Sequence, residues 1–143
     1  MIHFPKLQVT TTRTITYTIP GQPIPWKRPG GVKHRFDEQK YDKMIVGLQL
    51  RHQHTSQPKF IGSLLFDIEF HFSIPQKVKN KEAWLGRYVT RTPDCSNLLK
   101  FYEDAAQGIL FEDDKQIVQG TFRKIYGIDP KTVIRITELK ESV

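Results

Sequence analysis

The alternating segment SLLFDIEFHFSI, residues 63–74, constrains the fold more than any other part of this sequence. Its apolar residues occupy every second position: Leu64, Phe66, Ile68, Phe70, Phe72 and Ile74. Successive side chains of a β-strand point to opposite faces, so we expect a strand whose apolar face lies in the core. The other face carries Asp67, Glu69 and His71, which we expect to be solvated or paired with lysines of a neighbouring strand. An alternative is a second metal site on these three side chains.

Four other segments have the patterns of regular structure. Residues 13–19 alternate, and residues 117–126 and 131–139 are typical of two strands that a short turn joins into a hairpin. Residues 97–109 have the periodicity of an amphipathic helix. With one further helix before residue 63, the order predicts an α+β fold, a single domain with a mixed β-sheet and two main helices packed on it.

That further helix is expected to begin at Asp37, whose carboxylate is placed to cap it. Apolar residues recur at three- and four-residue spacing, which predicts the packed side of the helix. They are Tyr41, Met44, Ile45 and Leu48. Residues 1–12 have no clear periodicity and contain Pro5, so we expect a flexible N-terminal tail, with residues 13–143 as the folded domain.

Charge is unevenly distributed along the 143 residues, whose formal net charge is +7. Residues 1–93 carry 15 Lys/Arg against 6 Asp/Glu, whereas residues 94–143 carry 7 against 9. So basic a molecule should attract a polyanion. Nucleic acid is the natural one, because Lys and Arg contacts to phosphate supply most non-specific affinity. The alternative is a charge that serves only solubility.

The sequence contains no run of about 18 apolar residues, so it predicts no membrane span. The N-terminus also lacks the order of a secretory signal. Cys95 is the only cysteine, which excludes an internal disulfide and a Cys-based zinc site within one chain. We therefore expect a protein of the reducing cytoplasm with no membrane partner.

Two basic segments are candidates for contact with nucleic acid. Residues 21–35 are rich in Pro and Gly, and they combine Trp26 with the basic side chains Lys27, Arg28, Lys33, His34 and Arg35. Residues 76–91 interleave Trp84 and Tyr88 with Lys77, Lys79, Lys81, Arg87 and Arg91. Cations beside aromatic rings suit phosphates and unstacked bases. The alternative is a pair of solvated surface loops.

Acidic residues are concentrated in residues 93–116, which hold six acids against two lysines. Asp94 precedes the predicted helix, and Asp113 and Asp114 follow it. Mg²⁺ held by two or three carboxylates can promote phosphodiester cleavage. Asp94 and Asp114 could converge only if residues 110–114 fold back along the helix, which at about 12 residues is roughly 18 Å long.

The polar side of this helix would display Lys100 in line with Asn97 and Asp104. Lys100 could neutralise a phosphate or steady an attacking water. Ordinary structural roles are the alternative: Asp94 or Ser96 as a helix cap, Lys100 with Asp104 as an ion pair, and Asp113-Asp114 as a turn.

The motif PD–x–x–N–L–x–K, followed by D–D–x–Q, resembles the RusA family of Holliday-junction resolvases. It is formed by Pro93, Asp94, Asn97, Leu98, Lys100, Asp113, Asp114 and Gln116. The WKRP and IPQKVKNKEAW segments also resemble that family, and the resemblance spans roughly residues 14–139. It implies a homodimeric endonuclease of DNA recombination and repair that makes paired symmetric nicks in branched DNA. The implied cofactor is Mg²⁺, with Mn²⁺ as the alternative, and the implied roles are metal ligation by Asp94 and Asp114 and catalysis by Lys100.

One position departs from the family pattern, because Ser96 stands where the family has a second aspartate. A hydroxyl is a far weaker Mg²⁺ ligand than a carboxylate. Asp113, Glu103 or Asp104 could substitute, Asp104 being best placed by helix geometry and Asp113 by its proximity to Asp114. Otherwise Ser96 binds through water, or the protein binds junctions without cleaving them well. Ser96, Asn97 and Glu103 are expected beside the ligands.

Overall fold

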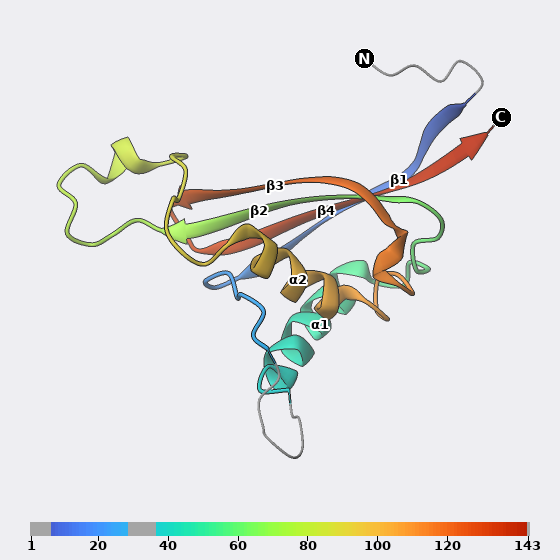
Figure 1. Cartoon of the computed structure of the whole chain (residues 1–143), viewed down its shortest axis with the longest axis horizontal. Helices are drawn as coiled ribbons and strands as arrows, with labels where there is room; N and C mark the ends of the chain where they lie inside the picture. Colours follow the sequence, from blue (N-terminus) through green and yellow to red (C-terminus); the bar gives the residue numbers. More distant parts are fainter. Residues whose placement is uncertain (1–6, 29–36, 143) are drawn as a thin grey trace.

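The computed structural model describes residues 7–28 and 37–142. The strands are β1 (Gln8–Pro20), β2 (Leu64–Ser73), β3 (Ile117–Gly127) and β4 (Lys131–Ser142). The helices are α1 (Lys40–His54) and α2 (Cys95–Ala106), with short 3-10 turns η1 (Lys81–Trp84) and η2 (Asp114–Gln116). Both main helices lie on one side of the sheet (Figure 1), which confirms the predicted α+β domain with a mixed sheet.

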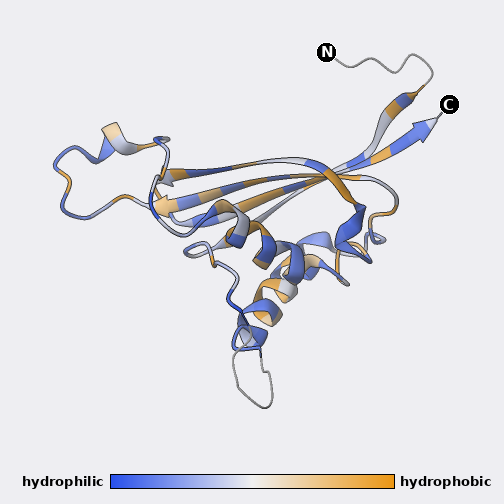
Figure 2. Cartoon of the chain, in the orientation of Figure 1, coloured by the Kyte–Doolittle hydropathy of each residue, from blue (hydrophilic) through white to orange (hydrophobic). Residues whose placement is uncertain are grey.

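The strand order is β1-β4-β2-β3, with β3 parallel to β2 and the other pairs antiparallel. The predicted hairpin is wrong, because β2 lies between β3 and β4. An interior position gives β2 hydrogen-bonded neighbours on both sides, and the helices on one side of the sheet bury its apolar face. Hydropathy alternates along the strands accordingly (Figure 2). Strand β3 therefore runs back past α2, from the C-terminal end of that helix towards its start.

The apolar side of α2 packs on the sheet as predicted. Its buried residues are Leu98, Phe101, Tyr102, Ala105 and Ala106. Phe101 was not predicted; it is fully buried and meets the ring of Tyr102 edge-on. The helix ends at Ala106, close to the predicted stop at Gly108, which adopts a positive φ of 84°.

Helix α1 packs with a different side from the one predicted. Its buried residues are Val46, Gly47, Leu50 and His54. The prediction of the packed side is wrong, because its residues are exposed: Tyr41, Met44, Ile45 and Leu48. Gly47 supplies the physical reason, since a Cβ there would lie 2.6 Å from Cδ1 of Ile109. The small residue lets α1 approach α2 closely.

The start of α1 also differs from the prediction. The N-cap residue is Gln39, which makes no side-chain capping bond. Asp37 lies just before the helix, where its carboxylate accepts the Gln39 amide (2.9 Å) and pairs with Lys43 (2.9 Å). Asp37 therefore organises the approach to the helix without capping it.

Strand β1 begins at Gln8, so residues 8–12 of the expected tail belong to the sheet. They pair with the end of β4, with Gln8 opposite Ser142. These two strand ends extend beyond the body of the domain (Figure 1). Residues 1–6 of the expected tail lie outside the described residues.

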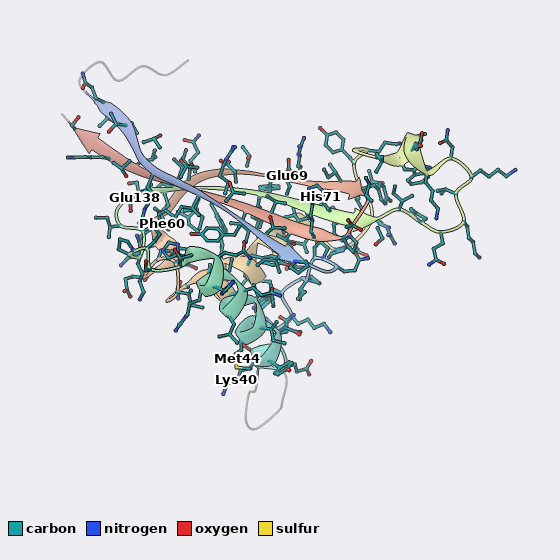
Figure 3. The ribbon with its side chains drawn as sticks, turned by 180° about the vertical axis from the view of Figure 1, so that it is seen from behind. Lys40, Met44, Phe60, Glu69, His71 and Glu138 are labelled. Atoms are coloured by element: carbon teal, nitrogen blue, oxygen red, sulfur yellow. The ribbon has the colours of Figure 1, made fainter. Side chains whose placement is uncertain are left out.

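The polar face of β2 pairs with its neighbouring strands, as predicted, although with arginines rather than lysines. Asp67 accepts hydrogen bonds from Thr121 (2.7 Å) and Arg135 (3.4 Å). Glu69 pairs with Arg123 and contacts His71. Figure 3 shows Glu69 and His71 on the side of the sheet away from the helices. Because these carboxylates already have cationic or hydroxyl partners, the alternative of a second metal site gains no support.

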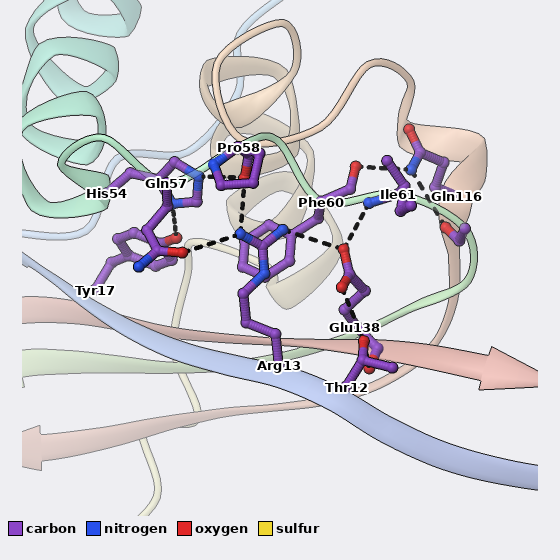
Figure 4. A network of polar contacts seen from close by, with 11 residues as sticks. Thr12, Arg13, Tyr17, His54, Gln57, Pro58, Phe60, Ile61, Gln116 and Glu138 are labelled. Carbon is purple, nitrogen blue, oxygen red and sulfur yellow. Dashed lines mark hydrogen bonds and ion pairs between the residues drawn. The ribbon is translucent and has the colours of Figure 1, made fainter.

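A polar network fastens β1 to the segment that follows α1 (Figure 4). Arg13 donates to the Pro58 carbonyl (2.8 Å), pairs with Glu138 (3.1 Å) and lies over the ring of Phe60 (4.3 Å). The buried His54 contacts the Tyr17 hydroxyl at 2.5 Å and the Pro58 carbonyl at 3.0 Å. Both ring nitrogens of the buried His54 thus have hydrogen-bonding partners.

Replacing Gly47 tests the packing of α1. We expect Gly47→Val to lower the free energy of unfolding by about 1–3 kcal/mol, because the added atoms would push α1 away from Ile109 and α2. Urea unfolding followed by circular dichroism measures the change. His52→Val is the control, since it puts the same side chain at an exposed position of the same helix. Equal losses in the two variants would show that α1 does not pack through Gly47.

Candidate active site

The first candidate residue, Asp94, lies at the N-terminal end of α2. It occupies the N-cap position, yet its side chain makes no capping hydrogen bond and is exposed. The Asp94 carboxylate therefore does not cap the helix, which was the structural alternative for this residue. Lys124 of β3 fixes the preceding backbone, donating to the carbonyl oxygens of Pro93 (2.7 Å) and Arg91. Ser96 and Asn97, in the first turn, are also exposed.

Lys100 lies one turn further along the polar side of α2. Its Nζ is 3.7 Å from the centre of the Trp26 ring, a cation–π contact. The Trp26 amide donates to the Asn97 carbonyl (2.9 Å), so the ring is fastened to the same helix. The ion pair of Lys100 with Asp104, considered as the structural alternative, does not form; a carboxylate oxygen of Asp104 lies 3.7 Å from Nζ of Lys43 in α1 instead. Trp26 thus positions Lys100, a role that the sequence did not reveal.

The Asp113-Asp114 pair lies beyond the C-terminal end of α2, in a turn built by two glutamines. Gln107 accepts the Asp114 amide (2.8 Å), and Gln116 accepts the Asp113 amide (3.0 Å). The Asp113 carboxylate accepts the Lys115 amide (3.0 Å), completing a capping box with Gln116. The Asp113 carboxylate therefore stabilises the turn, which is the structural role considered for it. The Asp114 side chain, by contrast, is exposed. The glutamine of the D–D–x–Q motif shapes the turn.

Acids crowd one another at this end of α2. Burial, and then the charges of Asp114 and Asp104, raise the pKa of Glu103. Desolvation, together with Asp113 and Asp104, raises the pKa of Asp114. In contrast, the Lys115 amide holds the pKa of Asp113 below its usual value. The raised pKa values of Glu103 and Asp114 mean that their negative charges are unfavourable here, so a cation bound beside them would be stabilised.

The structure does not bring Asp94 and Asp114 together within one chain. Asp94 is at one end of α2 and Asp114 is tied to Gln107 at the other, separated by a helix about 18 Å long. The return segment does not fold back along α2, because Leu110 and Phe111 are fully buried. They anchor the chain at the C-terminal end, where the Phe60 amide donates to the Leu110 carbonyl (2.8 Å).

The carboxylate groups around Asp114 carry the oxygen atoms that Mg²⁺ and Mn²⁺ prefer as ligands. Beside burial, the charges of Asp114 and Asp104 raise the pKa of Glu103, and the charge of Asp104 contributes to the raised pKa of Asp114, so a bound cation would relieve repulsion there. Among the described residues, however, no three His, Cys, Asp or Glu side chains are arranged as a ready metal cage. The donor chemistry fits a divalent ion that completes its coordination with water or phosphate.

The basic segment at residues 76–91 forms a loop that projects past the end of β2 and leads directly to Asp94 (Figure 1). Its exposed cations are Lys77, Lys79, Lys81, Arg87 and Arg91. The second half of the loop pairs with β3, where the Val89 amide donates to the Lys124 carbonyl (3.0 Å). The Arg87 guanidinium lies over the Trp84 ring (4.8 Å). Arg87 and Arg91 therefore lie on the part of the loop that is held near the Asp94 end of α2, whereas Lys77, Lys79 and Lys81 lie on the projecting part.

The other basic segment is described only in part. Lys27 and Arg28 are exposed, and the Lys27 amide donates to Gln39 (2.7 Å). Trp26 lies beneath Lys100 and is partly buried, so one face of its ring is unavailable to a base. Lys33, His34 and Arg35 lie outside the described residues.

Comparison with known proteins places the chain in a family. The family described as Endodeoxyribonuclease RusA matches residues 20–137, which is most of the chain. The chain belongs to the RusA endodeoxyribonuclease family. It is also 29% identical over 139 residues to the "Uncharacterized protein YqaN" of Bacillus subtilis (strain 168), across 87% of this chain and 96% of that protein.

Membership of the RusA family implies endodeoxyribonuclease activity, and the resolution of Holliday junctions is the activity of that family in general. RusA nucleases generally depend on divalent metal and act on branched DNA. No helix in the described part of this RusA-family chain is long and apolar enough to cross a membrane.

The burial of Glu103 and the acids beside it predict a pH-dependent stability. The pKa of Glu103 is higher in the folded chain than in the unfolded chain, so the fold is penalised as pH rises through the folded-state pKa. Below the ordinary glutamate pKa both states are protonated and the penalty vanishes. We expect Glu103→Gln to be more stable than wild type at neutral pH, with the difference shrinking towards acid pH. Thermal unfolding in EDTA measures this.

Glu112→Gln is the matched control for that experiment. Glu112 is exposed and pairs with Lys59 at 2.8 Å, so its removal should bring no gain in stability at any pH. A Glu103→Gln variant that is no more stable than wild type at neutral pH would show that neither burial nor the neighbouring acids penalise the charged Glu103 carboxylate.

Proposed function

We propose that this protein is a structure-selective endodeoxyribonuclease that resolves four-way DNA junctions by paired symmetric nicks, using Mg²⁺ or Mn²⁺. The observation that carries the proposal is the exposed polar side of α2. It has an uncapped carboxylate, Asp94, at one end, Lys100 above Trp26, and the crowded acids around Asp114 at the other end.

The proposed roles follow from these positions. A divalent ion, when bound, supplies positive charge to the phosphate and makes water more acidic. Asp114 and Asp104 would hold it, with Glu103 alongside in place of the carboxylate missing at Ser96. Asp113 is the weaker substitute, since its carboxylate already accepts the Lys115 amide. Lys100 would neutralise phosphate charge, because its ammonium is fixed yet exposed.

The start of α2 suits a phosphate of the DNA backbone. The first amides of a helix attract anions, and here the Asp94 side chain does not occupy them. Asp94 would then orient a water or a second ion beside that phosphate. Successive phosphates of one DNA strand rise by about 3.4 Å, so a helix side of about 18 Å can follow several of them. The exposed lysines of residues 76–91 would continue this path.

Paired symmetric nicks require two active sites, so we propose a homodimer as the acting form. The alternative function is that of a non-catalytic branched-DNA-binding protein. Two observations favour it: Ser96 replaces an acid of the family pattern, and the described residues include no ready three-ligand metal cage.

Cleavage of a synthetic four-way junction in Mg²⁺ tests the proposal. We expect wild type to nick the junction and Asp94→Asn and Asp114→Asn each to lose at least about 100-fold in rate, the scale on which charge stabilisation of a transition state acts. Junction binding should be kept or tightened, because phosphate repulsion falls. Glu112→Gln, which removes an exposed acid near Asp114, is the control and should nick like wild type.

The same assay separates the two functions. Unchanged nicking by Asp94→Asn or Asp114→Asn would contradict the proposed site. If wild type binds the junction but does not nick it in Mg²⁺ or Mn²⁺, the non-catalytic alternative holds. Nicking that appears only in Ser96→Asp would identify the missing carboxylate as the cause.

A further inference from the structure

The segment that joins β1 to α1 passes beside α2 (Figure 1) and is fastened to that helix by two hydrogen bonds. The Trp26 amide donates to the Asn97 carbonyl (2.9 Å). Two residues earlier, the Ile24 amide donates to the hydroxyl of Tyr102 (3.0 Å), a buried residue of α2. The two anchor points lie more than one helical turn apart, so the segment is aligned with α2 rather than tied to it at a single point.

Gln39 holds the same segment from the side of α1. Its side-chain amide donates to the Pro25 carbonyl (2.7 Å), and its side-chain oxygen accepts the Lys27 amide (2.7 Å). One side chain thus holds the backbone on both sides of Trp26. Gln39 is only 3% exposed, and a buried amide with partners at both its nitrogen and its oxygen has little freedom to move. The Trp26 indole is consequently held at one position relative to α2.

Lys100 lies over this fixed ring, with Nζ 3.7 Å from the ring centre. Helical spacing would otherwise let the ammonium reach Glu103 or Asp104, three and four residues further along α2. Neither acid pairs with Lys100 in the part of the chain that the structure describes, and Asp104 lies by Lys43 instead. A carboxylate would cancel the charge of the ammonium. An indole has no net charge, so it leaves the ammonium positive, with N–H groups that can still donate to phosphate oxygens.

We propose that Trp26 is a positioning residue that holds the Lys100 ammonium apart from Glu103 and Asp104 and keeps its charge available to a DNA phosphate. The inference rests on the phosphate-neutralising role proposed above for Lys100. It adds Gln39 as a second positioning residue, which acts through Trp26. A lysine on a helix surface otherwise samples many rotamers, and a phosphate contact must overcome the entropy of fixing one of them. Trp26 fixes the side chain before DNA binds.

Proton NMR of the protein in EDTA, without DNA, tests the contact directly. Protons above the face of an indole are shielded, so we expect the ε-methylene protons of Lys100 to resonate upfield of those of the other lysines. Their signal is identified by its absence from Lys100→Met. It should return to the ordinary lysine position in Trp26→Leu and stay partly shifted in Trp26→Phe, which keeps an aromatic ring. Unshifted Lys100 protons in wild type would overturn the proposal.

Gln39→Met tests whether Gln39 acts through Trp26. The substitution keeps the length of the side chain but removes both hydrogen bonds to the segment, so we expect a smaller upfield shift of the Lys100 protons. Gln53→Met is the matched control, because Gln53 of the same helix also makes two hydrogen bonds to backbone, both to Thr18 (2.8 Å). This variant should keep the wild-type shift. An unchanged shift in Gln39→Met would remove Gln39 from the positioning role.

The salt dependence of junction binding tests what the positioned charge does. Each protein cation that contacts a DNA phosphate contributes about 0.9 to the slope of log affinity against log salt. At a fixed Ca²⁺ concentration, we expect Lys100→Met to lower the slope for a synthetic four-way junction by about that amount. Trp26→Leu should lower it equally, because Lys100 then pairs with an acid, whereas Trp26→Phe should keep the wild-type slope. Circular dichroism checks that each variant is folded.

Two outcomes of the binding experiment would overturn the proposal. A Lys100 that merely became flexible would still contact phosphate, so a wild-type slope in Trp26→Leu would show that the ring does not keep the charge available. The double variant Trp26→Leu/Lys100→Met should have the slope of Lys100→Met alone, because Trp26 acts through Lys100. A further fall in the double variant would mean that Trp26 contacts DNA itself.

These results are independent of the nuclease assay. Shifted Lys100 protons and equal slopes of Lys100→Met and Trp26→Leu, in a protein that does not cleave junctions, would keep the positioning role and remove the proposed catalysis. Cleavage by a protein whose Lys100 protons are unshifted would remove the positioning role and keep the nuclease.

Discussion

The packing of α2 on β2 is the constraint on which the candidate site depends. Strand β2 presents an apolar face in the middle of the sheet, and α2 covers it with Leu98, Phe101 and Tyr102, none of them more than 1% exposed. Once that side of the helix is buried, helical periodicity places Asn97 and Lys100 on the opposite side. The same packing that stabilises the fold therefore displays the polar residues of the family motif.

The turn after α2 determines how those residues are distributed. Gly108 ends the helix, and the burial of Leu110 and Phe111 directs the chain straight into β3. Asp114 consequently stays at the C-terminal end, while Asp94 stays at the N-terminal end. The result is an extended polar strip along α2 rather than a compact cage of carboxylates. The length of the strip suits an extended polymer, and the family acts on branched DNA. Because its acids outnumber Lys100, we expect a phosphate backbone to approach it only with a divalent ion bound.

Periodicity predicted the elements well and their partners poorly. The strand at β2 and the amphipathic α2 follow from local pattern alone, since each has one dominant apolar face. The hairpin of β3 and β4 was wrong because strand pairing depends on β2, a segment remote in sequence. The predicted orientation of α1 was wrong because the side with the larger apolar residues was expected to pack. The side that does pack contains Gly47, which lets the helix approach its neighbour closely. Within the site, the motif identified Asp94, Lys100 and Asp114, but the support of Lys100 by Trp26 joins segments far apart in the chain.

The central claim is that the acids at the C-terminal end of α2 attract a divalent ion, and Mn²⁺ titration of the isotope-labelled protein tests it most directly. Mn²⁺ broadens the NMR signals of nearby nuclei. We predict that the amides of residues 103–107 and 113–116 broaden first, and that Asp114→Asn strongly weakens the effect. Broadening that is uniform over the chain, or confined to the region of Asp94, would contradict the claim.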